Sequence, residues 1–233
     1  MTAGSVVVAD GAALALRAAD WVAGRLAEGI AARGTASIAL AGGTTPRATY
    51  QLLAGDAGAR VSWPAVEIFF GDERAVPPDH PESNYRMARE ALLDRVAVDP
   101  GRVHRMAAES RDLDRAAADY AASLPASLDV VLLGIGSDGH VASLFPGNGA
   151  VTEQERRVVR VNSPKPPPVR LTITPPVIAA AAQVAVLATG AEKAAAVARA
   201  LEGPDDPAQT PACLARGGTW FLDSAAAARL GSR

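Results

Sequence analysis

Two titratable side chains, Asp138 and His140, occur in and directly after a glycine-rich turn, Gly-Ile-Gly-Ser-Asp-Gly at residues 134–139, which follows the apolar segment 130–133. Histidine changes charge near neutral pH, and a carboxylate beside it can orient the imidazole, so this pair has the chemistry of a general base. Ligands of open α/β sheets bind beyond the carboxyl ends of the strands. The pattern therefore predicts a general base at a strand end, although the spacing also allows Asp138 to cap the loop instead.

The same turn matches two other motifs, and its context argues against both. Its Gly-x-Gly-x-x-Gly spacing is typical of dinucleotide sites, but that motif needs a helix running on from the third glycine. Pro146 and Gly147 interrupt any such helix. A serine nucleophile elbow needs glycine two residues before Ser137, and Ile135 occupies that position. Asp138 and His140 remain as the reactive pair.

A second turn, Gly-Gly-Thr-Thr-Pro at residues 42–46, links a predicted strand to the start of a predicted helix. Glycines expose backbone N–H groups, hydroxyls add donors, and the helix dipole favours an anion. The segment lacks the Gly-Lys-Ser/Thr of a nucleoside-triphosphate-binding loop. Two interpretations remain: a phosphate-binding turn, or an ordinary capped turn between a strand and a helix. The candidate phosphate ligands are Gly42, Gly43, Thr44 and Thr45, joined by Lys193 at the start of a later helix.

Charged residues at two further places are candidates for substrate binding. Residues 71–74, Gly-Asp-Glu-Arg, follow another apolar strand and offer Asp72 as an orienting carboxylate and Arg74 as a cation, or else form a surface salt bridge. Lys165 and Arg170 flank a proline-rich loop, where they could clamp an anion or lie in solvent. Because the carboxyl ends of parallel strands share one sheet edge, we expect these turns to converge.

The elements that position these turns alternate between strands and helices, which favours an α/β fold with a largely parallel sheet. Strands are predicted at residues 35–41, 66–70, 103–106, 130–133, 157–161, 169–174, 183–188 and 218–222. Helices are predicted at 10–32, 46–53, 83–96, 112–122, from 175, from 193 to 201 and, rich in alanine, at the end of the chain. The proline-rich segments are short, so residues 1–233 are predicted to be one domain.

The bulk composition argues against several classes of protein. A net charge of −2 gives no reason to expect a nucleic-acid or membrane-surface partner. The single cysteine, Cys213, excludes an intramolecular disulfide and a multi-cysteine metal site, and His80 and His104 are interpreted as loop or packing residues. No apolar run approaches the roughly 20 residues of a membrane span, and no secretory signal is visible. We therefore expect a cytoplasmic globular protein.

Taken in chain order, these motifs resemble those of the glucosamine-6-phosphate isomerase/6-phosphogluconolactonase superfamily, and within it the 6-phosphogluconolactonases. The matching pieces are residues 40–46, 70–77, 83–85, 134–146, 163–168 and 189–193. The resemblance implies a doubly wound, Rossmann-like α/β fold with helices on both faces of the sheet. It also implies hydrolysis of 6-phosphoglucono-1,5-lactone to 6-phosphogluconate, in the oxidative pentose phosphate pathway, without a metal or organic cofactor.

The resemblance also separates the two branches of the superfamily. Deaminases and isomerases carry a glutamate five residues after the histidine, and Phe145 stands there in this chain. We therefore expect His140 to activate water for attack on the lactone, with Asp138 or Asp72 as its partner and Arg74, Lys165, Arg170 or backbone N–H groups as oxyanion donors. The alternatives are a sugar-phosphate isomerase or a non-catalytic sugar-phosphate sensor. We expect a monomer, with a dimer as the alternative.

Overall fold

The computed structural model describes residues 4–231, and its centre is a six-stranded parallel sheet with the strand order β1-β9-β8-β5-β2-β3. The strands of this sheet are β1 (Gly4–Val8), β2 (Ala36–Leu40), β3 (Val66–Phe70), β5 (Val130–Gly134), β8 (Gln183–Ala188) and β9 (Thr219–Asp223). The helices are α1 (Gly11–Arg33), α2 (Thr44–Leu53), α3 (Asn84–Ala91), α4 (Leu113–Ser123), α5 (Pro175–Ala180) and α6 (Ala194–Glu202). The predicted doubly wound α/β fold is therefore confirmed.

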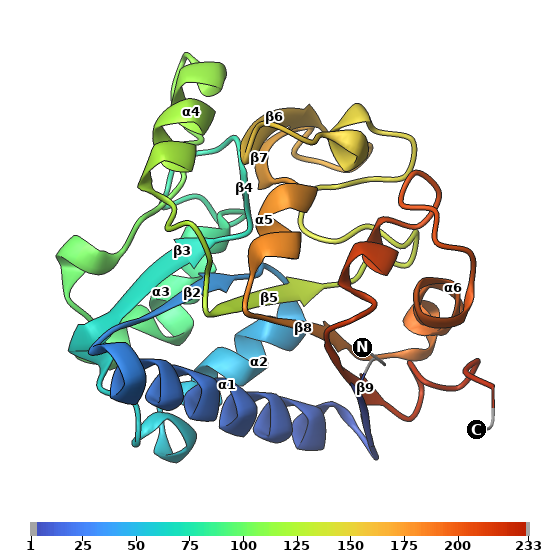
Figure 1. Ribbon diagram of the computed structural model, residues 1–233, viewed down its shortest axis with the longest axis horizontal. Helices are drawn as coiled ribbons and strands as arrows, with labels where there is room; N and C mark the ends of the chain where they lie inside the picture. Colours follow the sequence, from blue (N-terminus) through green and yellow to red (C-terminus); the bar gives the residue numbers. More distant parts are fainter. Residues whose placement is uncertain (1–3, 232–233) are drawn as a thin grey trace.

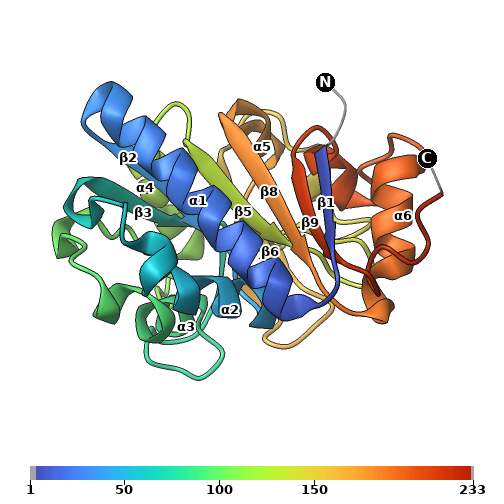
Figure 2. The same ribbon diagram turned by 90° about the horizontal axis from the view of Figure 1, so that it is seen from below.

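The two faces of the sheet pack against separate sets of helices because side chains alternate along each strand. Val130 and Leu132 of β5 belong to the core shared with α1, α2 and α3, whereas Val131 and Leu133 belong to the core shared with α4, α5 and α6. Figure 1 shows α1 and α2 below the sheet and α4 and α5 above it. Seen from below, α1 runs in nearly the same diagonal direction as β5 (Figure 2). Both faces of β5 are thus covered.

A second sheet, in the order β4-β7-β6, lies on the α4 and α5 side (Figure 1) and is antiparallel. Its strands are β4 (Asp72–Arg74), β6 (Val158–Asn162) and β7 (Val169–Ile173). The chain changes sheets at Gly71, whose N–H donates to Leu40 O while its own carbonyl accepts from Ile173 N. Residues 72–74 were expected in a turn. They form a strand because β7 pairs with them. This pairing is a tertiary contact, and the three polar residues alone do not predict it.

Several helix ends follow local capping rules. Asp10 caps α1 by accepting from Ala13 N, and Gly34 ends it with a left-handed φ of 79°. Ser83 caps α3 by accepting from Arg86 N. Pro46 lies in the first turn of α2, where its missing N–H costs nothing. Among residues 4–231, no helix combines the length and the apolarity that crossing a bilayer requires.

Four details of the expected elements are wrong. The predicted strand at 103–106 is a single bridge between Val103 and Ile68, because the chain then turns away as the His104 ring stacks on Phe69. The helix predicted for 83–96 ends at Ala91 and continues as a 3-10 turn. The alanine-rich end of the chain forms successive turns, which start where the Asp223 carboxylate accepts from Ala226 N. No strand was predicted for residues 4–8, which form β1 through parallel pairing with β9.

Candidate active site

The four glycine-containing strand ends meet at one cavity of about 220 Å³ at the carboxyl edge of the large sheet. This arrangement follows from the parallel order of β2, β3, β5 and β8, which brings their carboxyl ends together. The β6–β7 loop of the small sheet reaches the same cavity. Of the predicted site residues, those that line it are Gly42, Gly43, Thr44, Thr45, Asp72, Arg74, His140, Lys165, Arg170 and Lys193. Asp138 lies directly behind His140.

The imidazole of His140 is held by Asp138, with 2.5 Å between His140 Nδ1 and Asp138 Oδ1. Burial raises the pKa of the Asp138 carboxyl, but hydrogen bonds from His140 and Lys165 outweigh that effect and hold the pKa well below its usual range. An ionised carboxylate only accepts hydrogen bonds, so in the neutral ring Nδ1 carries the proton and Nε2 keeps a lone pair. The pair therefore has the tautomer that a general base needs.

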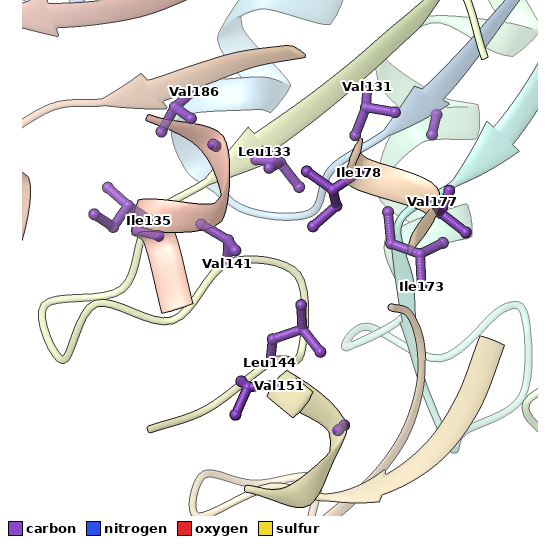
Figure 3. Close-up of a cluster of buried hydrophobic side chains, with 14 of the residues drawn as sticks. Val131, Leu133, Ile135, Val141, Leu144, Val151, Ile173, Val177, Ile178 and Val186 are labelled. Carbon is purple, nitrogen blue, oxygen red and sulfur yellow. The ribbon is translucent and has the colours of Figure 1, made fainter. Parts of the chain in front are cut away.

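Glycines shape the turn that carries this pair. Gly136 N donates to His140 O, Gly139 N donates to Gly136 O, and Gly139 has a left-handed φ of 94°. Apolar residues on either side, Ile135 and Val141, anchor the turn in the buried cluster that also contains Leu133 and Leu144 (Figure 3). A Cβ atom at Gly136 would lie 2.0 Å from His140 Nδ1 and 2.3 Å from Asp138 Oδ1. The pair occupies space that only glycine leaves free.

Replacing Gly136 with alanine should therefore lower kcat by about 10²-fold, because the methyl group must displace the imidazole by the order of 1 Å. Steady-state kinetics on the purified variant, with circular dichroism to establish folding, measures this effect. The matched control is Gly149→Ala, where a Cβ meets nothing within 4 Å. Equal activity of Gly136→Ala and Gly149→Ala would mean that the pair does not need its observed position.

The start of α2, which lines the same cavity, is suited to an anion. Gly43, with a φ of 105°, precedes α2, and within residues 4–231 no side chain caps this helix. The N–H groups of Thr44 and Thr45 thus remain available at the positive end of the helix dipole. Thr45 Oγ1 lies 2.8 Å from Thr189 Oγ1, which links this loop to the β8 end. Lys193, at the end of the 3-10 helix that follows Gly190, adds a cation to the same cavity.

A buried polar network forms the wall beneath the pair. The Asp72 carboxylate accepts from Asn84 Nδ2 at 2.9 Å and from Ser143 Oγ at 2.6 Å, and Arg170 Nη1 lies 3.9 Å from it. Asp72 and Arg170 are only 6% and 5% exposed, so this charge pair is shielded from solvent. In the described part of the chain, the hydrogen bonds of Asp72 go to this network and none goes to His140. Between the two carboxylates considered, the geometry favours Asp138 as the partner of His140.

The buried ring of Phe145 contacts both His140 and Arg170. Its ring centroid is 4.6 Å from that of His140, and the guanidinium carbon of Arg170 lies 5.5 Å from the same ring. The ring therefore provides an apolar contact for the imidazole and a cation–π partner for Arg170. A carboxylate at this position would face both groups at once.

Within residues 72–74, the two carboxylates have different environments. Glu73 is 3% exposed and accepts from the backbone N–H groups of Arg74, Asn84 and Tyr85 and from Ser83 Oγ, so it ties β4 to the start of α3. Burial raises the pKa of Glu73, and the N–H donors oppose that rise. Arg74 donates to Glu82 O at 2.6 Å and lines the cavity. Glu73 is structural, whereas Asp72 and Arg74 are at the site.

Sequence reasoning missed three residues that build the site. Asn84, expected only as a helix start, hydrogen-bonds Asp72, and a Cβ at Gly42 would lie 2.0 Å from its Oδ1. Ser143, which is fully buried, joins Asp72 to Arg170 and gave no signal of its own. The motif at residues 134–139 has three glycines, and the sequence does not show that Gly136 is the one whose missing side chain makes room for the pair. The spacing of the glycines was the one available signal.

Comparison with known proteins places this chain among relatives along nearly its whole length. The family model for glucosamine-6-phosphate isomerases/6-phosphogluconolactonase matches residues 9–222. A 6-phosphogluconolactonase of Streptomyces coelicolor is 44% identical, over 97% of this chain and 94% of that protein. One from Mycobacterium tuberculosis is 41% identical over the full length of both.

Solved structures agree. The 6-phosphogluconolactonase from Trypanosoma cruzi has a TM-score of 0.85 at 30% identity, covering 100% of this chain and 99% of its own. That from Trypanosoma brucei has a TM-score of 0.84 at 32% identity, covering 98% and 99%. A monomeric glucosamine-6-phosphate deaminase, 23% identical with a TM-score of 0.86 over 97% and 99%, shares the fold. The chain therefore belongs to the glucosamine-6-phosphate isomerase/6-phosphogluconolactonase family.

Proposed function

We propose that this protein hydrolyses 6-phospho-D-glucono-1,5-lactone to 6-phospho-D-gluconate. The observation that carries the proposal is a single cavity lined both by a carboxylate-held histidine and by an uncapped helix start with a lysine. A phosphorylated lactone has a phosphate for the helix start and a carbonyl carbon for the histidine. Relatives at 41–44% identity bear the name 6-phosphogluconolactonase, which supports the same assignment.

Phosphate binding orients the lactone. The phosphate oxygens accept hydrogen bonds from the N–H groups at Gly43, Thr44 and Thr45, with Gly42 giving the backbone room to approach and Lys193 supplying a cation. This anchor is remote from the reacting carbon, so its binding energy holds the carbonyl near the base.

His140 then acts first as a base and then as an acid. Its Nε2 takes a proton from water as the water oxygen forms a bond to C1, and the carbonyl electrons move to the carbonyl oxygen. When the carbonyl reforms, the C1–ring oxygen bond breaks, and the imidazolium returns the proton to the ring oxygen. The product acid then loses its own proton to solvent. Asp138 stabilises the imidazolium between these two steps.

Arg74 is the oxyanion donor that we favour. Its side chain lines the cavity, and in the described part of the chain its hydrogen bond goes to the backbone oxygen of Glu82. Arg170 is already engaged with Asp72, Ser143 and the carbonyl oxygens of Pro166 and Pro167. A guanidinium with a free donor can meet the negative charge that develops on the carbonyl oxygen.

Acid release from freshly generated lactone, with and without enzyme, tests the proposed function, since δ-lactones also hydrolyse unaided. Faster release with enzyme supports it. Ammonia release from glucosamine 6-phosphate would instead identify a deaminase, and binding without turnover would identify a sensor. A cytoplasmic location, a monomeric state with a dimer as the alternative, and a single domain over residues 1–233 stay predictions.

Replacing Lys193 with methionine should raise KM by about 10- to 100-fold while kcat changes little, because a charge-assisted hydrogen bond to phosphate is lost from both ground and transition states. Initial rates across a range of lactone concentrations measure both constants. The control is Arg111→Met, which removes an exposed cation that does not line the cavity. An unchanged KM in Lys193→Met would remove Lys193 from the phosphate site.

A further inference from the structure

The carboxylate of Asp138 has two partners, one on each oxygen. His140 Nδ1 lies 2.5 Å from Oδ1, and Lys165 Nζ lies 3.0 Å from Oδ2. Asp138 and His140 come from the turn after β5, whereas Lys165 comes from the loop between β6 and β7. Lys165, from the small sheet, thus contacts the Asp138–His140 pair, which follows β5 of the large sheet. It does so through Asp138, on the side away from His140 Nε2.

The loop that carries Lys165 is held in place without any help from a ligand. Its ends are closed by Ser163 N donating to Pro168 O at 2.7 Å, and Ser163 Oγ accepts from Lys165 N at 3.0 Å. Four of its six residues, 163–168, are prolines with a fixed φ, which reduces the freedom of the loop.

Arg170 donates hydrogen bonds to backbone oxygens of the same loop. Its Nη2 donates to Pro166 O at 3.3 Å and its Nε donates to Pro167 O at 3.4 Å. Arg170 is itself buried beside Asp72. The buried network under the site therefore fixes the residues next to Lys165.

We propose that Lys165 is a positioning residue for the hydrolysis proposed above, on which this inference rests. By taking Oδ2 of Asp138 it shares the carboxylate with His140 and keeps the imidazole neutral and ready to accept a proton from water. In this role Lys165 acts through Asp138 and does not bind the substrate phosphate. Only two of the 23 cationic residues, Lys165 and Lys193, are lysines. A compact ammonium suits a contact with a single oxygen.

The physical reason is electrostatic. Asp138 alone would favour the imidazolium form of His140, whereas a cation on the second oxygen offsets part of that charge. The hydrogen bond from Lys165 is also one cause of the low pKa of the Asp138 carboxyl. The other charged groups around the pair are Asp72, Arg74, Arg170 and Lys193, which line the same cavity, and Arg199, which lies beside Gly139. All of them remain when Lys165 alone is changed.

Lys165→Met tests this role in the ligand-free protein. The titration midpoint of the His140 imidazole, followed by ¹⁵N NMR, should move to higher pH by about one unit, because the remaining carboxylate then favours the protonated ring. The acid limb of the kcat/KM profile should move in the same direction, with little change in KM at the plateau. His80 and His104, the other two histidines, serve as internal references whose midpoints stay in place.

Two further variants sharpen the test. Lys165→Arg retains a cation and should return the midpoint most of the way to the wild-type value. Arg160→Met removes an exposed cation from β6 of the same hairpin and should leave it unchanged. An unchanged or lower midpoint in Lys165→Met would overturn the proposal, as would a steep rise in KM without a change in midpoint. Because the NMR measurement needs no turnover, failure of the proposed lactonase activity would be seen separately.

Discussion

Replacing His140 with alanine should lower kcat for lactone hydrolysis by about 10²–10⁴-fold while leaving KM nearly unchanged, because the variant loses its base but keeps the phosphate anchor. Among the described residues that line the cavity, His140 alone has an imidazole, and Asp138 accepts from its Nδ1 so that Nε2 of the neutral ring is the accepting atom. The measurement is acid release from freshly generated lactone, corrected for the spontaneous reaction. Binding of 6-phosphogluconate, followed by calorimetry, should persist in the variant.

The matched control for this result is His104→Gln. His104 also has a carboxylate partner, with Nε2 lying 2.6 Å from Glu67 Oε2, but it does not line the active-site cavity. Its replacement should leave kcat unchanged even if the protein becomes less stable. A His140→Ala enzyme with wild-type turnover would mean that water is activated by another group.

Replacing Asp138 with asparagine is expected to have the next largest effect, a fall in kcat of at least about 10²-fold. An asparagine amide can donate to Nδ1, which would move the ring proton to Nε2 and remove the accepting lone pair. In serine proteases the corresponding change costs about 10⁴-fold through the wrong tautomer. The pKa of Asp138 is held well below its usual range, so its carboxylate stays charged wherever the enzyme is assayed, and the variant lacks that charge at every pH.

¹⁵N NMR of the imidazole distinguishes this cause from simple unfolding. In the wild type Nδ1 should carry the proton, and in Asp138→Asn the signals should shift toward the Nε2–H form. The adjacent Ser137→Ala change, at an exposed position of the same turn, should alter neither the tautomer nor kcat. Wild-type turnover in Asp138→Asn, with the tautomer unchanged, would show that Asp138 serves only to shape the loop.

The convergence of the site could be predicted because its parts are local. Each of the turns at residues 42–46, 134–139 and 189–193 follows a short apolar strand, and parallel pairing brings such turns to one edge. The places of His140 and of the turn at residues 42–46 could be predicted for the same reason. Strand β4 was not, since its three polar residues form a strand only through pairing with β7.

The parts that escaped prediction depend on contacts between distant segments. The Ser143 hydroxyl meets Asp72, 71 residues away along the chain, and Lys165 meets Asp138 through the rigid hairpin loop. Sequence spacing predicted Lys165 as a possible clamp for an anion, and its place on Asp138 became visible only in three dimensions. Buried polar partners of this kind carry no periodicity that a sequence pattern could show.

Strand β5, which leads into the turn with Asp138 and His140, is paired on both sides, by β2 and by β8, and is covered on both faces by separate cores. A segment enclosed in this way opens only with the cooperative unit as a whole, whereas edges and loops can open locally. The strand is therefore lost only when the fold as a whole unfolds, whereas the turn with Asp138 and His140 lies beyond its end and can open earlier. For a destabilised variant of this protein, activity on heating should therefore fall no later than the folded fraction does.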